Sequence, residues 1–217
     1  MKFKSIAACV LLSVLASMNA ATPPAPRPNI LFIAIDDQND WIAPLAGHAQ
    51  VKTPHLDRIA ARGTLFSNAH TQAPLCNPSR SSLLTGLRPS STGIYGLKPG
   101  IRDVAATKNH VTLPQTFTRA GYTTSAAGKI YHDGSVMPKD QLTEFNTWAN
   151  TAPTPRPPKP IAKIPEPRHP LMDWGPWPAK DEDTGDYRIA TAAIEALKAA
   201  PADKPFFVAA GFRLPHV

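Results

Sequence analysis

Cysteine is scarce in this chain of 217 residues, which contains only Cys9 and Cys76. Cys9 lies inside a short apolar run that follows basic residues near Met1 and precedes a pair of alanines. This layout predicts a cleaved secretory signal over residues 1–21. Its removal leaves Cys76 as the only thiol. In an oxidising compartment an unpaired thiol indicates either intermolecular pairing or a reactive group.

Long apolar runs are also missing after the predicted signal, so we expect no membrane-spanning helix. The N-terminal run itself is too short to cross a bilayer. Cys9 lies within that run and not just after it, which argues against a lipoprotein. The sequence therefore predicts a secreted or periplasmic protein.

Acidic residues are fewer than basic ones, 16 against 23, which gives a formal net charge of +7. The lysines and arginines are scattered and no basic motif is interleaved with aromatic residues, so we expect no nucleic-acid partner. Two interpretations of the charge remain open, namely attraction of an anionic substrate and ordinary surface solvation.

Strand and helix signals alternate along the chain, and no internal repeat is visible. The apolar run from Asn29 to Ile35 predicts a buried strand of the parallel type. We also predict strands at 64–69, 122–127 and 205–210, and helices at 54–62, 79–84, 114–120 and 186–199. The pattern indicates a single α/β domain over 29–217, in which helices cover both faces of a largely parallel sheet. Residues 22–28 form a proline-rich leader.

Two groups of residues carry the first indications of chemistry. Asp36 and Asp37 follow the first predicted strand, at the sheet edge where α/β proteins bind ligands. Adjacent carboxylates suit a hard divalent cation. Cys76 is expected just before a helix N-terminus, where backbone amides favour an anionic nucleophile or a bound anion.

The segment around Cys76, Leu-Cys-Asn-Pro-Ser-Arg followed by Leu-Leu-Thr-Gly, resembles the signature of the type I sulfatases. The resemblance implies that Cys76 is oxidised to formylglycine, whose hydrated aldehyde attacks sulfur. It also implies a maturation enzyme that recognises Cys76, Pro78 and Arg80. Arg80 would then hold the formylglycine and its charge.

Two further segments are similar to motifs of the same family. In Gly128-Lys129-Ile130-Tyr131-His132, the resemblance assigns Lys129 to a sulfate oxygen and His132 to assistance of the nucleophile. The two residues between Lys129 and His132 match iduronate-2-sulfatase-like members. The segment 205–216 ends in His216, which by resemblance binds sulfate and protonates the leaving oxygen, a role suited to histidine.

The resemblance as a whole implies an alkaline-phosphatase-like fold and Ca²⁺ bound by Asp36, Asp37 and the modified Cys76. The implied substrate is a sulfated carbohydrate. Two alternatives are a phosphonate or phosphate monoester hydrolase of the same superfamily and a non-catalytic glycan-binding protein. Gln38 and Asn39 are candidates for lining the cleft. No role is expected for the remaining histidines, His48, His55, His70, His110 and His169.

Residues 151–178 are rich in proline and predict a long surface excursion without helix or strand. It is either a tolerated insertion or a wall of the cleft in which Trp174 or Trp177 stacks on a sugar ring. The family's second metal pair and a further sulfate-binding lysine do not occur before Val217. We therefore expect an N-terminal fragment of the fold that alone binds metal poorly and turns over little.

Overall fold

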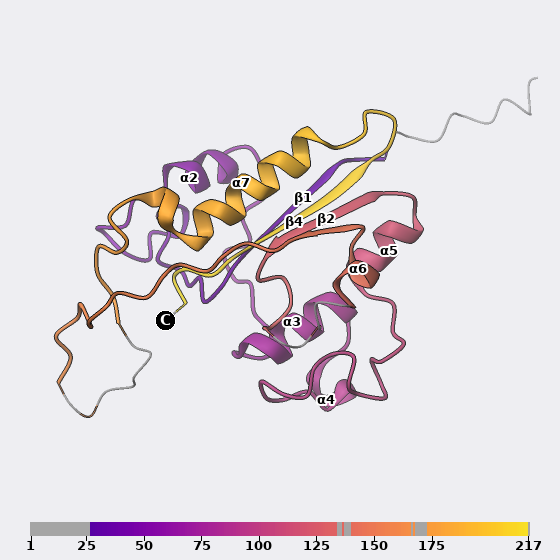
Figure 1. Cartoon of the computed structure of the whole chain (residues 1–217), viewed down its shortest axis with the longest axis horizontal. Helices are drawn as coiled ribbons and strands as arrows, with labels where there is room; N and C mark the ends of the chain where they lie inside the picture. Colours follow the sequence, from indigo (N-terminus) through magenta and orange to yellow (C-terminus); the bar gives the residue numbers. More distant parts are fainter. Residues whose placement is uncertain (1–26, 134–135, 137–139, 166, 168–172, 217) are drawn as a thin grey trace, which may run out of the picture.

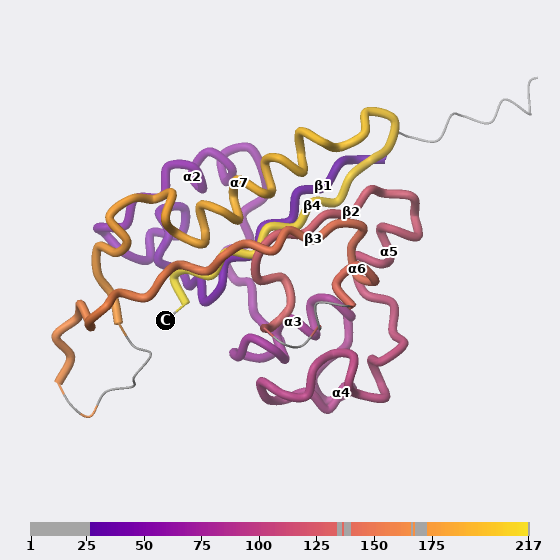
Figure 2. The backbone as a smooth tube through the Cα atoms, in the orientation of Figure 1, coloured from indigo at the N-terminus to yellow at the C-terminus, as the bar shows by residue number. Residues whose placement is uncertain are grey.

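The fold is built on a sheet of four parallel strands. The computed structural model describes residues 27–133, 136, 140–165, 167 and 173–216. In this part of the chain the strands lie in the order β1, β4, β2, β3 (Figure 1; β3 is labelled in Figure 2). Their bounds are β1 Ile30–Ile35, β2 Thr123–Gly128, β3 Thr147–Ala149 and β4 Phe206–Phe212. The predicted signal at 1–21 and most of the leader at 22–28 lie outside the described residues.

Helices lie on both faces of the sheet, as Figure 2 also shows. Helix α7 packs on β2 and β4 on one face, whereas α5 packs on β2 and contacts α3 on the other. The described helices are η1 Ala43–Leu45, α2 Pro54–Ala60, α3 Cys76–Thr85, α4 Pro89–Thr92, α5 Leu113–Arg119, α6 Gln141–Glu144, η3 Asp181–Asp183 and α7 Gly185–Lys198.

The two central strands, β4 and β2, are buried on both faces of the sheet, so successive residues of each strand pack into two different cores. Ala126 and Ala209 pack into the core under α5, which also holds Phe207. Val208 and Ala210 pack into the core under α7. Such strands read as continuous apolar runs and not as alternating ones. The α/β class with a parallel sheet predicted from the sequence is therefore confirmed.

Strand β1 departs from the expectation of a buried strand. It pairs only with β4 among the described residues, and Leu31 and Ile33 are 47% and 46% exposed. The apolar run correctly located the strand. It did not reveal that the outer face of β1 is uncovered, because that depends on which elements pack against it.

Two other local predictions are wrong. Residues 64–69 form no strand: all six are exposed, and none pairs with a strand of the sheet. The helix expected at 79–84 begins at Cys76, with Leu75 as its N-cap. The earlier start is compatible with Pro78, because the first turn of a helix needs no intrahelical N–H donors. Cys76 thus lies within the first turn and not before it.

The remaining elements begin and end within about two residues of their predicted bounds. The described residues of 151–178 contain no helix or strand, as predicted. The Trp177 indole N–H donates a hydrogen bond of 2.8 Å to the Pro155 carbonyl. Trp174 is 61% exposed. In the described part of the chain, no helix has both the length and the apolar character needed to cross a bilayer.

Candidate active site

The carboxyl edge of the sheet brings together residues that are far apart in the sequence. Asp36 follows β1, Lys129 follows β2 and Cys76 begins α3. The Lys129 Nζ lies 3.6 Å from the Cys76 Sγ, and the Sγ lies 3.9 Å from Asp36 Oδ1. Asp36 and Lys129 are both 5% exposed, whereas Cys76 is half-buried. A thiol with partial access to solvent therefore faces a buried cation.

Asp36 is the electrostatic centre of this cluster. Its Oδ1 accepts a 2.8 Å hydrogen bond from Arg80 Nη2, and its Oδ2 accepts one from Lys129 Nζ. Burial by itself would raise the pKa of Asp36, but the hydrogen bonds and charges of Lys129 and Arg80 outweigh it and lower the pKa. The carboxylate therefore stays ionised, and it holds both cations beside Cys76.

Arg80 also connects the helix to the second motif. Its Nη1 donates to the backbone carbonyls of Lys129 and Ile130, the latter at 3.2 Å. Arg80 is four positions after Cys76, so both lie near the same side of the first turns of α3. Arg80 thus fixes the position of Cys76 relative to Lys129.

A pair of glycines allows the ends of β2 and β4 to approach closely at this site. Gly128 has a φ of +75°, which favours glycine, and it is in register with Gly211. A Cβ on Gly128 would overlap the Gly211 carbonyl, and a Cβ on Gly211 would overlap the Lys129 carbonyl. The Lys129 N–H donates a 2.8 Å hydrogen bond to the Gly211 carbonyl. The glycines thereby set where the lysine leaves the sheet.

His132 lies beside the cluster, on the loop that follows β2. Its pKa is lowered from the ordinary value of 6.5, first by burial and next by the positive charge of Lys129. The carboxylate of Asp133 acts in the opposite direction. At neutral pH the imidazole is therefore uncharged and can accept a proton.

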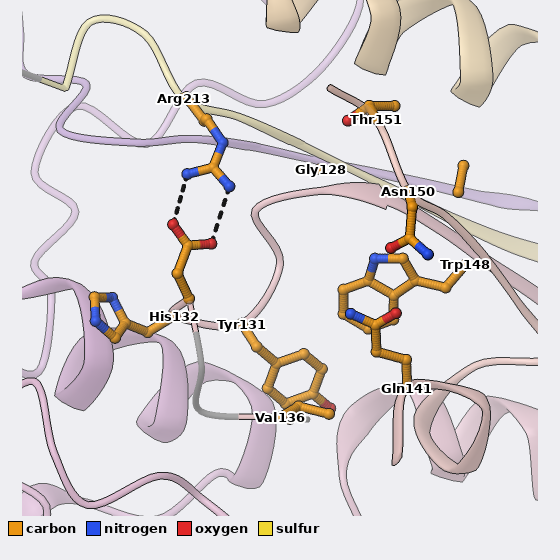
Figure 3. Close-up of a pocket in the computed structure, with 11 residues that line it drawn as sticks. Gly128, Tyr131, His132, Val136, Gln141, Trp148, Asn150, Thr151 and Arg213 are labelled. Atoms are coloured by element: carbon orange, nitrogen blue, oxygen red, sulfur yellow. Dashed lines mark hydrogen bonds and ion pairs between the residues drawn. The ribbon is translucent and has the colours of Figure 1, made fainter. Parts of the chain in front are cut away.

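Sequence reasoning missed an ion pair next to His132. Arg213 Nη1 and Nη2 donate to the two Asp133 oxygens at 2.7 and 2.9 Å, which ties the loop after β2 to the end of β4 (Figure 3). The Asp186 carboxylate accepts from the backbone N–H groups of Arg213 and Leu214. These contacts hold the segment that leads to His216.

His216 completes the group of possible metal ligands. Ligand atoms of Asp36, Cys76 and His216 lie within 4.8 Å of one another, and His216 Nε2 lies 3.8 Å from Asp37 Oδ2. Asp37 is exposed and has a φ of +57°. The two carboxylates suit Ca²⁺, whereas a thiol and an imidazole do not. The position of Cys76 fits that ion only when an oxygen replaces its sulfur.

Other polar residues considered from the sequence do not join the cluster. Gln38 donates to the Asn39 carbonyl, and Asn39 Oδ1 accepts from Trp41 N–H, so both side chains bond within their own turn. His110 bonds to the Thr85 carbonyl. The histidines with only local partners are His48, His55 and His70. His169 lies outside the described residues.

A buried carboxylate, also missed, supports the second motif from below. Glu144 is 1% exposed and accepts hydrogen bonds from Arg102 Nε, Thr112 Oγ1 and Tyr131 Oη, each at 2.7 Å. Burial first, and then the charge of Glu144, raise the pKa of Tyr131, so its phenol stays protonated and donates. Because Tyr131 lies between Lys129 and His132, this network anchors both.

Comparisons with known proteins show the family of this chain. The profile of the Sulfatase family matches residues 28–217. The chain belongs to the sulfatase family. A sulfatase from Formosa agariphila is 36% identical over 212 residues, which cover 88% of this chain and 39% of that protein. The chain thus spans about two fifths of the length of that sulfatase.

Two further similarities agree with this membership. Iduronate 2-sulfatase of Mus musculus is 37% identical over 126 residues, which cover 58% of this chain and 22% of that protein. The solved structure of a 2-O glycosaminoglycan sulfatase superposes with a TM-score of 0.61 at 27% identity, covering 88% of this chain and 36% of that one. The family and the fold inferred from the sequence are therefore confirmed.

Proposed function

We propose that the protein hydrolyses sulfate esters of glycans, with position 76 as the nucleophile. The observation that carries this proposal is the 3.6 Å approach of Lys129 Nζ to Cys76 Sγ, with both groups next to the buried Asp36. A nucleophile and a desolvated cation within one contact distance can together engage a sulfate group, since the cation stabilises charge that develops on its oxygens.

The chemistry of position 76 follows the family pattern. With Cys76 oxidised to formylglycine by a maturation enzyme, the hydrated aldehyde would supply the hydroxyl that displaces the sugar oxygen from sulfur. Lys129 binds a sulfate oxygen, while Arg80 and Asp36 keep Lys129 and the nucleophile in place. A maturation enzyme would recognise Cys76, Pro78 and Arg80.

Two histidines divide the proton transfers. His132 is neutral at physiological pH because burial and Lys129 lower its pKa, so it serves as the base beside the nucleophile. His216 follows β4, the neighbour of β2, and serves as the acid that protonates the leaving oxygen. Asp36, Asp37 and the modified Cys76 would hold Ca²⁺, which withdraws charge from a bound sulfate oxygen.

The biological setting follows from the N-terminal sequence and from the relatives. We propose export to the periplasm or the outside of the cell, directed by residues 1–21. The substrates are sulfated carbohydrates, since the similar proteins include an iduronate 2-sulfatase and a glycosaminoglycan sulfatase. Sulfated polysaccharides are polyanions, to which the basic charge is complementary: +7 for the whole chain, less 2 for Lys2 and Lys4 of the predicted signal.

The proposal is tested by measuring inorganic sulfate released from sulfated oligosaccharides by the protein as its host makes it. We expect release from sulfated sugars and none from aryl phosphonates. Hydrolysis of phosphonates alone would replace the proposal with a phosphonate or phosphate monoester hydrolase. Binding of glycans with an unmodified Cys76 and no sulfate release would replace it with a glycan-binding protein.

The acid limb of the pH profile of kcat/KM should lie below 6.5, the ordinary pKa of histidine. A lowered pKa keeps His132 neutral to a lower pH, so activity that needs the unprotonated imidazole persists as the pH falls. Asp133→Asn removes a carboxylate that raises this pKa and should move the limb further toward acid. The exposed Asp203 serves as the control, since Asp203→Asn should leave the limb in place. A limb that moves upward in Asp133→Asn contradicts the role of His132.

A further inference from the structure

A cavity of about 150 Å³ lies at the carboxyl edge of the sheet, on the β3 side of the cluster around Asp36. One wall is charged and is formed by His132, Asp133 and Arg213. The opposite wall carries the Trp148 indole together with two amide side chains (Figure 3). These amides belong to Gln141 and Asn150.

The cavity adjoins the site already described. Gly128, which precedes Lys129, and His132 both line it. Ala149 and Arg213 place it at the ends of β3 and β4, where open α/β sheets bind ligands. We therefore expect a molecule held at Lys129 by its sulfate group to place the atoms next to that group in this cavity.

We propose that this cavity is a subsite for one sugar ring of the glycan. The proposal rests on the proposed function for the identity of the ligand. The volume of the cavity, about 150 Å³, is that of a protein cavity that takes one six-membered ring. The indole of Trp148 supplies an apolar surface for the C–H face of a sugar, and the amides of Gln141 and Asn150 both donate and accept hydrogen bonds to hydroxyls.

The charged wall selects for hydroxyls and against a second anion. Arg213 already donates two hydrogen bonds to Asp133, so its charge is balanced before a ligand arrives. The carboxylate of Asp133 is 60% exposed and accepts from O–H groups, whereas it repels a sulfate or a carboxylate. The cavity thus takes the neutral part of a sugar, while Lys129 takes the sulfate.

Contacts within the protein position both walls before a ligand binds, which limits the entropy lost on binding. Asp186 accepts from the backbone N–H of Arg213 at 2.8 Å and from that of Leu214 at 2.9 Å. On the other side, Trp148 packs edge-on against Phe145 with ring centroids 5.5 Å apart. The two walls are therefore held apart by the fold itself.

Binding is measured by isothermal titration with the Cys76→Ala protein, which cannot turn over its ligand. The probes are disaccharides of chondroitin sulfate and of heparin, each with and without its sulfate groups. We expect Asn150→Ala to weaken binding of at least one sulfated disaccharide about five-fold, the effect of one lost hydrogen bond. The exposed Asn109 lies outside the cavity, so Asn109→Ala should change nothing.

A second pair of variants tests the ring. Trp148→Phe keeps an aromatic side chain against Phe145 and should perturb binding. Phe66→Leu changes an aromatic side chain that is 76% exposed and outside the cavity, so it should not. In NMR spectra the indole N–H of Trp148 should shift on titration. The subsite is overturned if no probe binds at concentrations up to about 10 mM, which is above the dissociation constant of a weak complex. It is also overturned if the Asn150 and Trp148 variants bind the probes as the parent protein does.

Failure of the subsite and failure of the proposed function give different results. Sulfate release with equal kcat/KM for the wild type and Asn150→Ala removes the subsite and leaves the hydrolase. Disaccharide binding that depends on Asn150, without sulfate release by the protein from its host, leaves the subsite and removes the hydrolase.

Discussion

Replacing Cys76 with alanine should reduce sulfate-ester hydrolysis by about 10³-fold or more, the scale of loss when a covalent nucleophile is removed. The residue occupies the first turn of α3, and its Sγ is 3.6 Å from Lys129 Nζ. Alanine lacks the thiol through which the Cβ is oxidised to the aldehyde, so no nucleophile can form at this position. Lys129, still held by Asp36, would bind sulfate as before, so the loss should fall mainly on kcat.

Stability should change little in the same variant. The Cys76 side chain is only half-buried, and alanine has the highest helix propensity, so the free energy of unfolding should stay within about 1 kcal/mol. Leu83→Ala changes an exposed residue of the same helix and serves as the matched control for activity. Mass spectrometry of the wild-type peptide should show conversion of the thiol to the aldehyde. Residual turnover near the wild-type rate in Cys76→Ala would exclude position 76 as the nucleophile.

The sequence predicted where the candidate site lies because three local motifs end at the same edge of a parallel sheet. Asp36 and Lys129 follow strands, and strands that run in parallel present their carboxyl ends together. What could not be predicted is how the charges are shared. Asp36 binds both Arg80 and Lys129, an arrangement that depends on side-chain placement and on the close approach of Gly128 and Gly211.

The missed residues have partners far away in the chain and no motif of their own. Asp133 and Arg213 are 80 positions apart, and each alone looks like a surface charge. Glu144 ends a four-residue helix that carries almost no periodic signal, yet it is buried among partners from three segments. The one usable indication was position, because Asp133 directly follows a motif histidine and Arg213 lies three residues before another.

Fold elements were predicted best where caps and flanking glycines mark their ends. Helix α5 begins after Thr112, whose side chain and that of Gln115 form a capping box, and Gly121 follows its C-cap. The failure at 64–69 has a different origin. Leu65 and Phe66 suit a strand by composition, but strands are stabilised by pairing, and no neighbour pairs there.

Glu144→Ala should be the most destabilising single change among those proposed, with a loss of about 3–5 kcal/mol in the free energy of unfolding. It removes a fully buried carboxylate and leaves Arg102, Thr112 and Tyr131 without their shared acceptor. A buried cation without its counter-charge accounts for most of this cost. Glu144→Gln keeps an acceptor oxygen of the same size but not the charge, so its loss should be smaller.

Chemical denaturation measures these differences, and Glu195→Ala provides the matched control. Glu195 pairs with Lys198 on the surface of α7, where both side chains are more than 60% exposed, so its loss should stay within about 0.5 kcal/mol. Activity distinguishes a general loss of stability from a specific effect on the site. Below the unfolding transition, Glu144→Gln should lower kcat/KM for sulfate esters, because Tyr131 then holds the segment between Lys129 and His132 less firmly. Unchanged kinetics with reduced stability would limit Glu144 to the core.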